Sequence, residues 1–487
     1  MAKYYVAAGA ASTNVGAATN SATPCNLNAA WDDMAAGTTI ATGDTIELAP
    51  GLYNNTTTDV PVAGLGDSAA DISLIIQTSA DTPDNCIIDF SGTNADVDGF
   101  RVTTTGTFEY KGMTIKGADP NAGEGQISMI DGTLELWDCI VEGRSLTAGA
   151  GSLIQLTSTA AAGKVYAYNC EFSNGPTDGI DCGGAGGALA DRGIFVYNCY
   201  FHDIGTGIDS ANQAITPHNG ATIEVGHCKF ERCGRPDKGG AIGSDANESN
   251  GVIFNNEFYG VLTAVGLRGD TVVVKNNYFQ DIILNVVINT LAAGGTITFE
   301  NNTVINPAAG AYLLFCNNVA MDINILGNYV HAVNSWGDAM IFGATTGDRA
   351  STLTMEDNQI ISLSPAAKYM IRNASQNVVL NRNVIYTNAA ATSNGVIRND
   401  NATTAVVLTM NDNKIRWNST DRFISAATGV PAAYTGGNNM KNVDVGYWGY
   451  GTDYPIKGDD TLDENISLKS INGLVWTELY RGKNSWW

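Results

Sequence analysis

The chain has 487 residues, with 49 Asp or Glu against 26 Lys or Arg, which gives a formal net charge of −23 and a pI near 4.4. This acidity argues against nucleic acid or an anionic membrane surface as a partner. No apolar run approaches the roughly 18 residues that a membrane-spanning helix needs, and the opening MAKYYVAAGA lacks the apolar core of a signal peptide. We therefore expect no membrane span and no signal peptide.

The first predicted element is a short amphipathic helix over residues 26–36. Leu27, Ala30, Trp31 and Met34 recur at helical spacing, so they lie on one face of that helix. Its apolar side requires a partner surface in the rest of the chain.

An eight-residue frame then recurs along most of the chain, reading apolar, any, apolar, any, any, a central residue, any, apolar. In the segment IFVYNCYF, residues 194–201, the central residue is Cys199. Successive central residues are about 27 residues apart, a spacing typical of solenoids. The central residues are Met113, Cys139, Cys170, Cys199, Cys228, Asn256, Asn277, Asn302, Asn328, Asn358, Asn383 and Asn413.

The alternation inside each frame indicates two short strands separated by a bend. About 15 further residues per repeat are too few for a substantial helix in every repeat. The sequence therefore predicts an all-β parallel solenoid of about 12–13 coils.

The central residues explain the bend. Asn accepts a left-handed backbone more readily than other non-glycine residues, so we expect it at the turn between the strands. With coils about 4.8 Å apart, the seven Asn side chains from Asn256 to Asn413 form a ladder of hydrogen-bonded amides. The four thiols from Cys139 to Cys228 form a neighbouring buried stack, reduced and structural.

These features resemble the pectin-lyase-like superfamily of right-handed parallel β-helices, in which inward Asn ladders mark a strand bend. KYYVAAGAAS, NLNAAWDDMAAG and GDTIELAPGLY near the N-terminus are similar to the opening of that superfamily. The resemblance implies that the helix caps the first coil. It gives three segments: residues 1–60 as cap and first coil, 61–437 as the β-helix, and 438–487 as a C-terminal segment.

The C-terminal segment loses the frame and is rich in aromatic residues, with GYWGYGTDYP at 446–455 and RGKNSWW at the end. Four of the eight Trp lie here, at 448, 476, 486 and 487. Aromatic residues are enriched at interfaces, whereas solenoids also need a terminal cap. The segment therefore either docks on a partner or covers the last coil.

The first candidate site is the repeated tripeptide Gly-Ile-Asp at 179–181 and 207–209. The repeats are 28 residues apart, so Asp181 and Asp209 are expected to lie in register on adjacent coils. Paired carboxylates can serve as an acid and a nucleophile or base, or bind a cation. Alternatively the tripeptide is a turn followed by an inward Ile, with the Asp in solvent.

The second candidate site is HCKFERCGRPDKGG at 227–240, which concentrates basic residues in an acidic chain. Lys229 and Glu231 should point outward, with Arg232 beside them. Related lyases use Lys or Arg as a base, whereas the alternative is a turn with solvated charges. His227 and Cys228 point to opposite sides, so we expect no metal site, and GGAGGA at 183–188 lacks the setting of a nucleotide loop, so we expect no cofactor.

Two functions of different class follow. The first is a bacteriophage virion appendage of tailspike type, which the resemblance favours, binding host-surface glycans without cleaving them. It would be made in the host cytoplasm and assembled with other virion proteins, commonly as a homotrimer. The alternative is a lyase or glycoside hydrolase acting on surface polysaccharide. That enzyme would use residues along a groove on one face, namely Asp181, Asp209, Lys229, Glu231 and Arg232.

Overall fold

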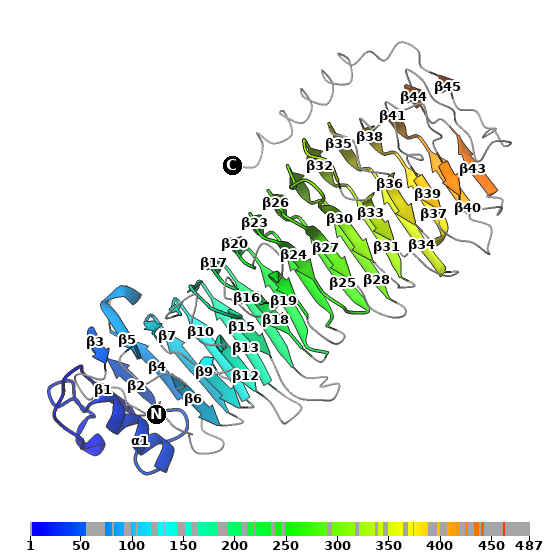
Figure 1. Cartoon of the computed structure of the whole chain (residues 1–487). Coiled ribbons are helices and arrows are strands. Elements are labelled where there is room, and N and C mark those ends of the chain that lie inside the picture. Colours follow the sequence, from blue (N-terminus) through cyan, green and yellow to red (C-terminus); the bar gives the residue numbers. More distant parts are fainter. Residues whose placement is uncertain are drawn as a thin grey trace.

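The structure is a computed structural model of the whole chain. It describes residues 2–54, 74–79, 82–91, 99–103, 106–117, 125–130, 132–143, 151–157, 163–182, 192–205, 212–218, 220–234, 239–244, 249–289, 295–316, 321–336, 339–343, 349–363, 369–373, 375–387, 397–399, 407–417, 424–426, 433–437, 440–442 and 461–462. Over these residues the chain is an all-β parallel solenoid with very little helix, drawn out along one axis in Figure 1. The predicted all-β parallel solenoid is confirmed, whereas the predicted number of 12–13 coils stays a prediction.

Three parallel sheets, named A, B and C here, form the walls of the solenoid, and the chain visits them in turn. Sheet A contains β1 (Lys3–Val6), β2 (Thr45–Leu48), β4 (Leu74–Thr78), β7 (Thr107–Lys111), β10 (Gly132–Trp137), β13 (Gly163–Tyr168), β16 (Gly193–Tyr197), β19 (Thr222–Gly226), β22 (Gly251–Phe254), β25 (Thr271–Lys275), β28 (Thr296–Glu300), β31 (Asp322–Leu326), β34 (Arg349–Glu356), β37 (Ser375–Asn381), β40 (Val407–Asn411) and β43 (Ala433–Gly437).

Sheet B follows sheet A in each coil and has the shortest strands. It contains β3 (Gly51–Asn54), β5 (Cys86–Asp89), β8 (Thr114–Lys116), β11 (Ile140–Glu142), β14 (Glu171–Ser173), β17 (Tyr200–His202), β20 (Lys229–Glu231), β23 (Glu257–Tyr259), β26 (Tyr278–Gln280), β29 (Thr303–Ile305), β32 (Tyr329–Ala332), β35 (Gln359–Ser362), β38 (Val384–Thr387), β41 (Lys414–Trp417), β44 (Met440–Asn442) and β45 (Thr461–Leu462).

Sheet C closes each coil before the chain returns to sheet A. It contains β6 (Phe100–Thr103), β9 (Gly125–Ile130), β12 (Ser152–Thr157), β15 (Ile180–Cys182), β18 (Gln213–Pro217), β21 (Gly240–Gly243), β24 (Thr263–Gly266), β27 (Asn285–Asn289), β30 (Tyr312–Cys316), β33 (Ala339–Gly343), β36 (Tyr369–Asn373), β39 (Ile397–Asn399) and β42 (Ile424–Ala426).

The bend between sheets A and B corrects one detail of the sequence interpretation. The left-handed residue is the one before the central residue: Asn301 has φ 52° and lies exposed, whereas Asn302 is buried. Asn276 and Asn255 take the same place in the two preceding coils, with φ of 56° and 54°. The exposed residue therefore makes the turn, and the central residue is free to point inward.

The central Asn residues form the predicted ladder. The amide oxygen of Asn328 accepts hydrogen bonds from the backbone N–H of Asn302 at 2.8 Å and from its Nδ2 at 3.1 Å. The Nδ2 of Asn328 donates to the carbonyl of Phe299 at 2.7 Å and to Oδ1 of Asn358 at 3.0 Å. Every amide group is satisfied inside the wall, which offsets the cost of burying it. The same oxygen-accepting pattern links Asn256, Asn277, Asn302, Asn328, Asn358, Asn383 and Asn413.

The thiols continue the same column toward the N-terminus. The backbone N–H groups of Cys170 and Cys199 each lie 3.4 Å from the Sγ of the next central residue. Cys228 is the junction, because its N–H donates to Oδ1 of Asn256 at 2.8 Å. All nine cysteines are free and buried. A neighbouring interior column holds stacked phenyl rings 4.7–5.0 Å apart, Phe172, Phe201, Phe230, Phe258 and Phe279.

The N-terminal helix is present as α1 (Leu27–Ala36), and Figure 1 places it at the blue end of the stack. The side chain of Asn26 caps it by accepting from the N–H of Ala29 at 2.7 Å. The predicted apolar face is buried, with the ring of Trp31 5.1 Å from that of Phe100. Short 3₁₀ turns lie at Val15–Ala17 and Pro83–Asn85. That α1 protects the end of the solenoid stays a prediction.

Near the C-terminus, β44 and β45 still add strands to sheet B beyond residue 438, where the C-terminal segment was expected to begin. The aromatic stretch at 446–455, the four Trp residues and the final RGKNSWW lie outside the described residues. Their role as a cap or an assembly element stays a prediction.

Candidate functional site

The five residues predicted for an enzyme do not share one face. Lys229 and Glu231 lie on β20 of sheet B, and Arg232 follows directly. Asp181 lies on β15 of sheet C, in register with Thr216 of β18 rather than with a second carboxylate. Asp209 lies outside the described residues. The strand register therefore does not pair Asp181 with a second carboxylate, and Asp181 lies on a different sheet from Lys229 and Glu231. That the five residues act together stays a prediction.

The residues of sheet B form a network of ion pairs. Lys229 Nζ lies 2.6 Å from Glu231 Oε1, and the same ammonium lies over the rings of Tyr200 and Tyr259 at 5.1 and 5.4 Å from their centroids. The hydroxyl of Tyr200 donates to Glu231 Oε2. The ammonium group of Lys229 thus has one carboxylate and two aromatic rings close by.

Arg232 completes this network from the turn after β20. Its Nε and one terminal nitrogen reach the two oxygens of Asp203 at 2.7 and 2.8 Å, a two-pronged pair. The nearby His202 lies 2.8 Å from Asp203 and 3.2 Å from Glu171. Arg232 holds the pKa of Asp203 at about 2, and Lys229 lowers that of Glu231. Asp203 and Glu231 therefore stay ionised near neutral pH and are poorly suited to act as the protonated acid of glycoside cleavage.

Sheet C carries a different group of residues around Asp181. The Oδ1 of Asp181 lies 3.1 Å from Nε2 of His218, which follows β18 in the next coil. Asp178, just before β15, accepts hydrogen bonds from the backbone of Gln213 at 2.8 Å and from the hydroxyl of Thr216 at 2.6 Å. The carboxylate and imidazole thus meet at one end of a strip of neighbouring strand positions that runs along the sheet.

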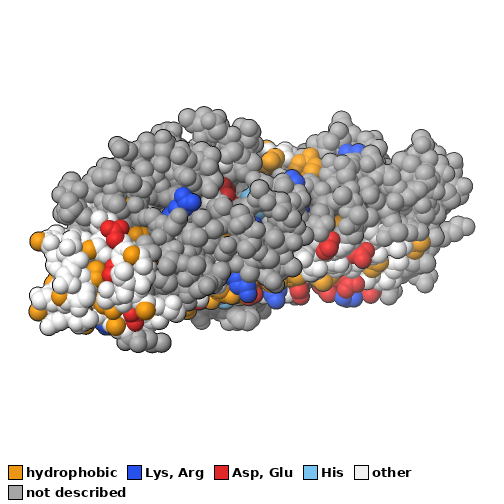
Figure 2. Space-filling view, turned by 90° about the horizontal axis from the view of Figure 1, so that it is seen from below, with side chains coloured by type: hydrophobic (Ala, Val, Ile, Leu, Met, Phe, Trp, Pro, Cys, Tyr) orange, Lys and Arg blue, Asp and Glu red, His pale blue; other side chains and the backbone are white. Residues whose placement is uncertain are grey.

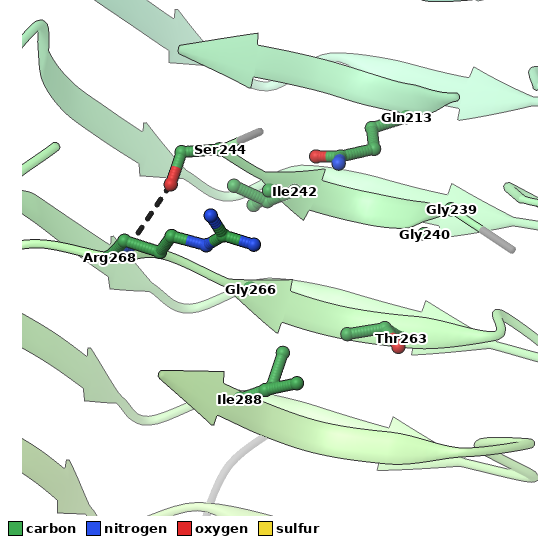
Figure 3. A pocket seen from close by; sticks show the side chains of 10 residues that line it. Gln213, Gly239, Gly240, Ile242, Ser244, Thr263, Gly266, Arg268 and Ile288 are labelled. Carbon is green, nitrogen blue, oxygen red and sulfur yellow. Dashed lines mark hydrogen bonds between the residues drawn. The ribbon is translucent and has the colours of Figure 1, made fainter. Parts of the chain in front are cut away.

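This strip continues into a pocket of about 170 Å³ on the next strands. Figure 3 shows its floor at Gly240 and Gly266, with the guanidinium of Arg268 directed over it. Glycine is required at position 240, because a Cβ there would lie 2.2 Å from the backbone carbonyl of Thr263. A Cβ on Gly243 would lie 2.2 Å from Oε1 of Gln213, so that side chain would have to move. The pocket is lined by Gln213, Gly239, Gly240, Ile242, Gly243, Ser244, Thr263, Gly266, Arg268 and Ile288.

Arg268 differs from the cations of sheet B in its surroundings. Its backbone N–H donates to Ser244 Oγ at 3.1 Å, the dashed line of Figure 3, whereas its guanidinium has no salt bridge among the described residues. Lys229 and Arg232, by contrast, are both paired with carboxylates. Figure 2 shows acidic side chains interspersed with Lys and Arg along one margin of the molecule. Within the described part of the chain, Arg268 therefore differs from Lys229 and Arg232 in having no carboxylate paired with its guanidinium.

Sequence reasoning missed the pocket and His218. The signal lay in the glycines of GGAIG, residues 239–243, and in Gly266, which leave one patch of the sheet without side chains. Single glycines are too common in turns to identify that patch before the strand register is known. Among the described residues no group of three or more His, Cys, Asp or Glu is placed to hold a metal ion. No helix in the described part of the chain has the length and apolar character to cross a membrane.

Comparison with known proteins bears on the fold. Residues 152–330 match the family model described as "Right handed beta helix region". Among solved structures, the catalytic unit of a thermostable GH87 alpha-1,3-glucanase from Streptomyces thermodiastaticus strain HF3-3 is similar with a TM-score of 0.33 and 12% identity. That alignment covers 89% of this chain and 65% of the glucanase chain, so this chain spans less than two thirds of the other's length. No curated protein matches. The family match therefore agrees with the parallel solenoid that the structure shows from sheet C strand β12 to sheet B strand β32.

Proposed function

We propose that the protein is a virion appendage that binds a host-surface polysaccharide along sheet C. The observation that carries this proposal is the open, glycine-floored pocket beneath Arg268. It lies within a row of residues that runs along the solenoid axis. Asp181, Thr216, Gly243, Gly266, Ile288 and Phe315 follow one another in that row.

The size and lining of the pocket suit one unit of a polymer. At about 170 Å³ it is smaller than the roughly 300–1,000 Å³ of a typical small-molecule site. Gln213, Ser244 and Thr263 offer amide and hydroxyl groups to sugar hydroxyls, and Arg268 offers a charge-assisted donor. Because each coil advances by about 4.8 Å, neighbouring coils present their own positions to successive units.

The appendage role rests on the shape and chemistry of the chain. A long stack of coils, as in Figure 1, is a shaft that presents one sheet to a surface over its whole length. A net charge of −23 disfavours binding to nucleic acid. We expect the chain to be incorporated in phage particles with other virion proteins, where the pectin-lyase-like resemblance favours a trimer.

A second function, cleavage of the bound polysaccharide, is favoured by one observation. Asp181 and His218 lie 3.1 Å apart at the edge of the same strip as the pocket. A carboxylate close to an imidazole is a common general acid or base pair, although the geometry of this contact is that of an ion pair and not of a hydrogen bond. The charged residues of sheet B do not take part in this version, because they belong to another sheet.

Binding is tested with the whole purified chain against an array of capsular polysaccharides and lipopolysaccharide O-chains. Arg268→Ala should lower the affinity for the preferred glycan about tenfold or more, because a hydrogen bond from a charged group contributes roughly 1.5–3 kcal/mol. Gly266→Ser should weaken binding by narrowing the floor. Lys275→Ala on β25 of sheet A is the matched control and should leave affinity unchanged.

Cleavage is followed in the same samples as absorbance at 235 nm for a lyase or new reducing ends for a hydrolase. Turnover that is lost in His218→Gln while binding is retained would establish the enzyme. Binding without turnover supports the appendage, as does detection of the chain in purified phage particles. Binding that is equal in Arg268→Ala and the wild type would overturn the site on sheet C.

A further inference from the structure

The outward side of sheet B carries no Asp, Glu, Lys or Arg over five consecutive strands, β26, β29, β32, β35 and β38. We call its outward residues the neutral face. All of them are partly exposed and alternate with buried residues such as Phe279 and Val330. They are Tyr278, Gln280, Thr303, Ile305, Tyr329, His331, Gln359, Ile361, Val384 and Tyr386.

This composition is local to one side of these coils. Sheet A, over the same coils, presents Lys275, Glu300, Asp322 and Glu356 among Thr and Asn residues. Most of the earlier strands of sheet B carry an outward charge, including Asp89, Lys116, Glu142, Glu171, Lys229 and Glu231. The chain has 49 acidic residues, yet none of these ten neighbouring outward positions is Asp or Glu. The neutral face is therefore a distinct surface.

Exposed aliphatic side chains extend the neutral face at the turns that follow its strands. Six large hydrophobic side chains are markedly exposed among the described residues, and four of them lie here. Asp281 also lies exposed at this margin, so charge returns at the turns. The four side chains are Ile283, Leu284, Val333 and Leu363, which are 38–44% exposed.

A charge of opposite sign stands at each end of the neutral face. The row through Tyr278, Thr303, Tyr329, Gln359 and Val384 begins with Glu257 on β23 and ends with Lys414 on β41. Both end residues are exposed. Each lies three strands from Tyr329, or about 14 Å at the usual strand spacing. The row is therefore symmetric about β32 in position and opposite in charge.

We propose that the neutral face binds a second copy of this chain through a two-fold axis at β32, with the two solenoids antiparallel. The axis brings Glu257 of one copy opposite Lys414 of the other, twice, with the uncharged side chains between them. A two-fold interface needs one self-complementary patch, and this row has that property. His331 also suits burial there, since burial lowers its pKa and keeps it uncharged near neutral pH.

A side-by-side parallel arrangement uses the row differently. In parallel copies the same levels meet, so that Glu257 approaches Glu257 and Lys414 approaches Lys414, which repel. The charges at the two ends therefore favour antiparallel over parallel pairing of two neutral faces. The trimer that the pectin-lyase-like resemblance favours would instead set this face against a different one. The mass of the assembly in solution distinguishes the two.

Sedimentation velocity of the whole chain should give twice its mass of 51.1 kDa. Tyr329→Asp places a charge on the axis and should shift the protein to monomer. Thr354→Asp is the matched control, on sheet A one coil further along, and should leave the mass unchanged. Glu257→Lys and Lys414→Glu should each weaken the dimer by setting like charges opposite each other. The double substitution should restore it.

Circular dichroism and thermal unfolding of each variant verify that loss of the dimer is not loss of fold. A wild-type monomer at every concentration up to the solubility limit would overturn the proposal. A trimer would overturn it as well, as would a dimer that Tyr329→Asp leaves intact. A monomer that dimerises only after residues 463–487 are deleted would show that the chain's own C-terminal segment occupies the face, and would also overturn it.

Discussion

The N-terminal and C-terminal halves of the solenoid share one frame but fill its central column with different groups. A ladder amide inside the column, such as that of Asn328, takes part in four hydrogen bonds of 2.7–3.1 Å. Each thiol makes fewer and longer contacts: the Sγ of Cys199 lies 3.4 Å from the N–H of Cys170 and 3.3 Å from the carbonyl of Tyr197. The same backbone therefore tolerates both columns, but only the amide satisfies its neighbours on both sides.

The outward surfaces of sheet B also differ between the two halves. We call the coils with central residues Cys139 to Cys228 the thiol half, and those with central residues Asn256 to Asn413 the amide half. The thiol half has ion pairs on its sheet B surface, centred on Arg232 and Asp203. The amide half has the neutral face instead. The difference teaches that a repeat fixes where side chains lie, whereas the chemistry at each place varies along the axis. The predictions below test how far the two halves differ in stability.

The largest effect is expected from Asn328→Ala. It leaves the Asn302 N–H, the Phe299 carbonyl and two neighbouring amide atoms without their partner inside the wall. Since a buried unsatisfied group costs about 1–3 kcal/mol, the loss should be roughly 3 kcal/mol or more. Hydrogen exchange of β28, β31 and β34 measures it locally, because so long a stack need not unfold in two states. Cys199→Ala is the matched change in the other half and should cost about 1 kcal/mol. Equal losses would refute the difference between the columns.

Alkaline pH should loosen the thiol half selectively. Burial raises the pKa of Cys139, Cys170 and Cys199 well above that of a free thiol. Their contribution is therefore complete below about pH 8.5 and falls above it, because only the opened chain can ionise them. The expected slope is about 1.4 kcal/mol per thiol for each pH unit.

The measurement is hydrogen exchange of β13 and β16 against β31 and β34 between pH 8 and 9.5, corrected for intrinsic rates. Cys170→Ala should reduce the pH dependence of the opening free energy in the thiol half by the contribution of one thiol, about 1.4 kcal/mol per pH unit. Identical pH dependence in both halves would show that the thiols do not control local opening.

The sequence was sufficient to predict the columns because their signal is periodic. Cys170, Cys199 and Cys228 recur at nearly constant spacing, since sheets A and B and the bend between them keep a constant length. The return through sheet C varies. Ile180 follows Cys170 by ten residues, whereas Ile215, its partner in register, follows Cys199 by sixteen. The repeated Gly-Ile-Asp therefore misled, because the strand that pairs with β15 begins only after the second copy of the tripeptide.

The pocket and the neutral face could not be predicted from the sequence, for a related reason. Gly240 and Gly266 indicate a pocket only when β21 and β24 are known to be adjacent. Glu257 and Lys414, 157 residues apart in sequence, share a row only through six successive strand pairings. Local alternation predicts the direction of each side chain, but the variable returns determine its neighbours.

A smaller effect is expected where the two columns meet. Cys228→Asn would extend the ladder by one coil, since Oδ1 of Asn256 already accepts from the backbone of residue 228. The new amide could donate to the carbonyl of Val196, which the thiol reaches only at 3.7 Å. We expect a gain of about 1 kcal/mol, seen as slower exchange in β19 and β22. Slower exchange should not appear for Cys139→Asn, whose neighbour Cys170 has no amide. A loss of protection in Cys228→Asn would mean that the thiol half lacks room for the larger side chain.

The smallest effect concerns acid and the ion pairs of sheet B. Arg232 holds the pKa of Asp203 at about 2, below the value of about 4 in an unfolded chain. The stabilisation is therefore present above pH 4 and is lost as the pH falls toward 2. Because the Arg232 side chain is 58% exposed, water screens the pair and the effect should be slight. Exchange in β17 and β20 should quicken over this range in the wild type and not in Arg232→Asn, which keeps a residue suited to the left-handed backbone at that turn. A wild-type response that survives in Arg232→Asn would assign the acid sensitivity to other carboxylates, and the ion pairs would then be a surface feature without a part in the stability of the thiol half.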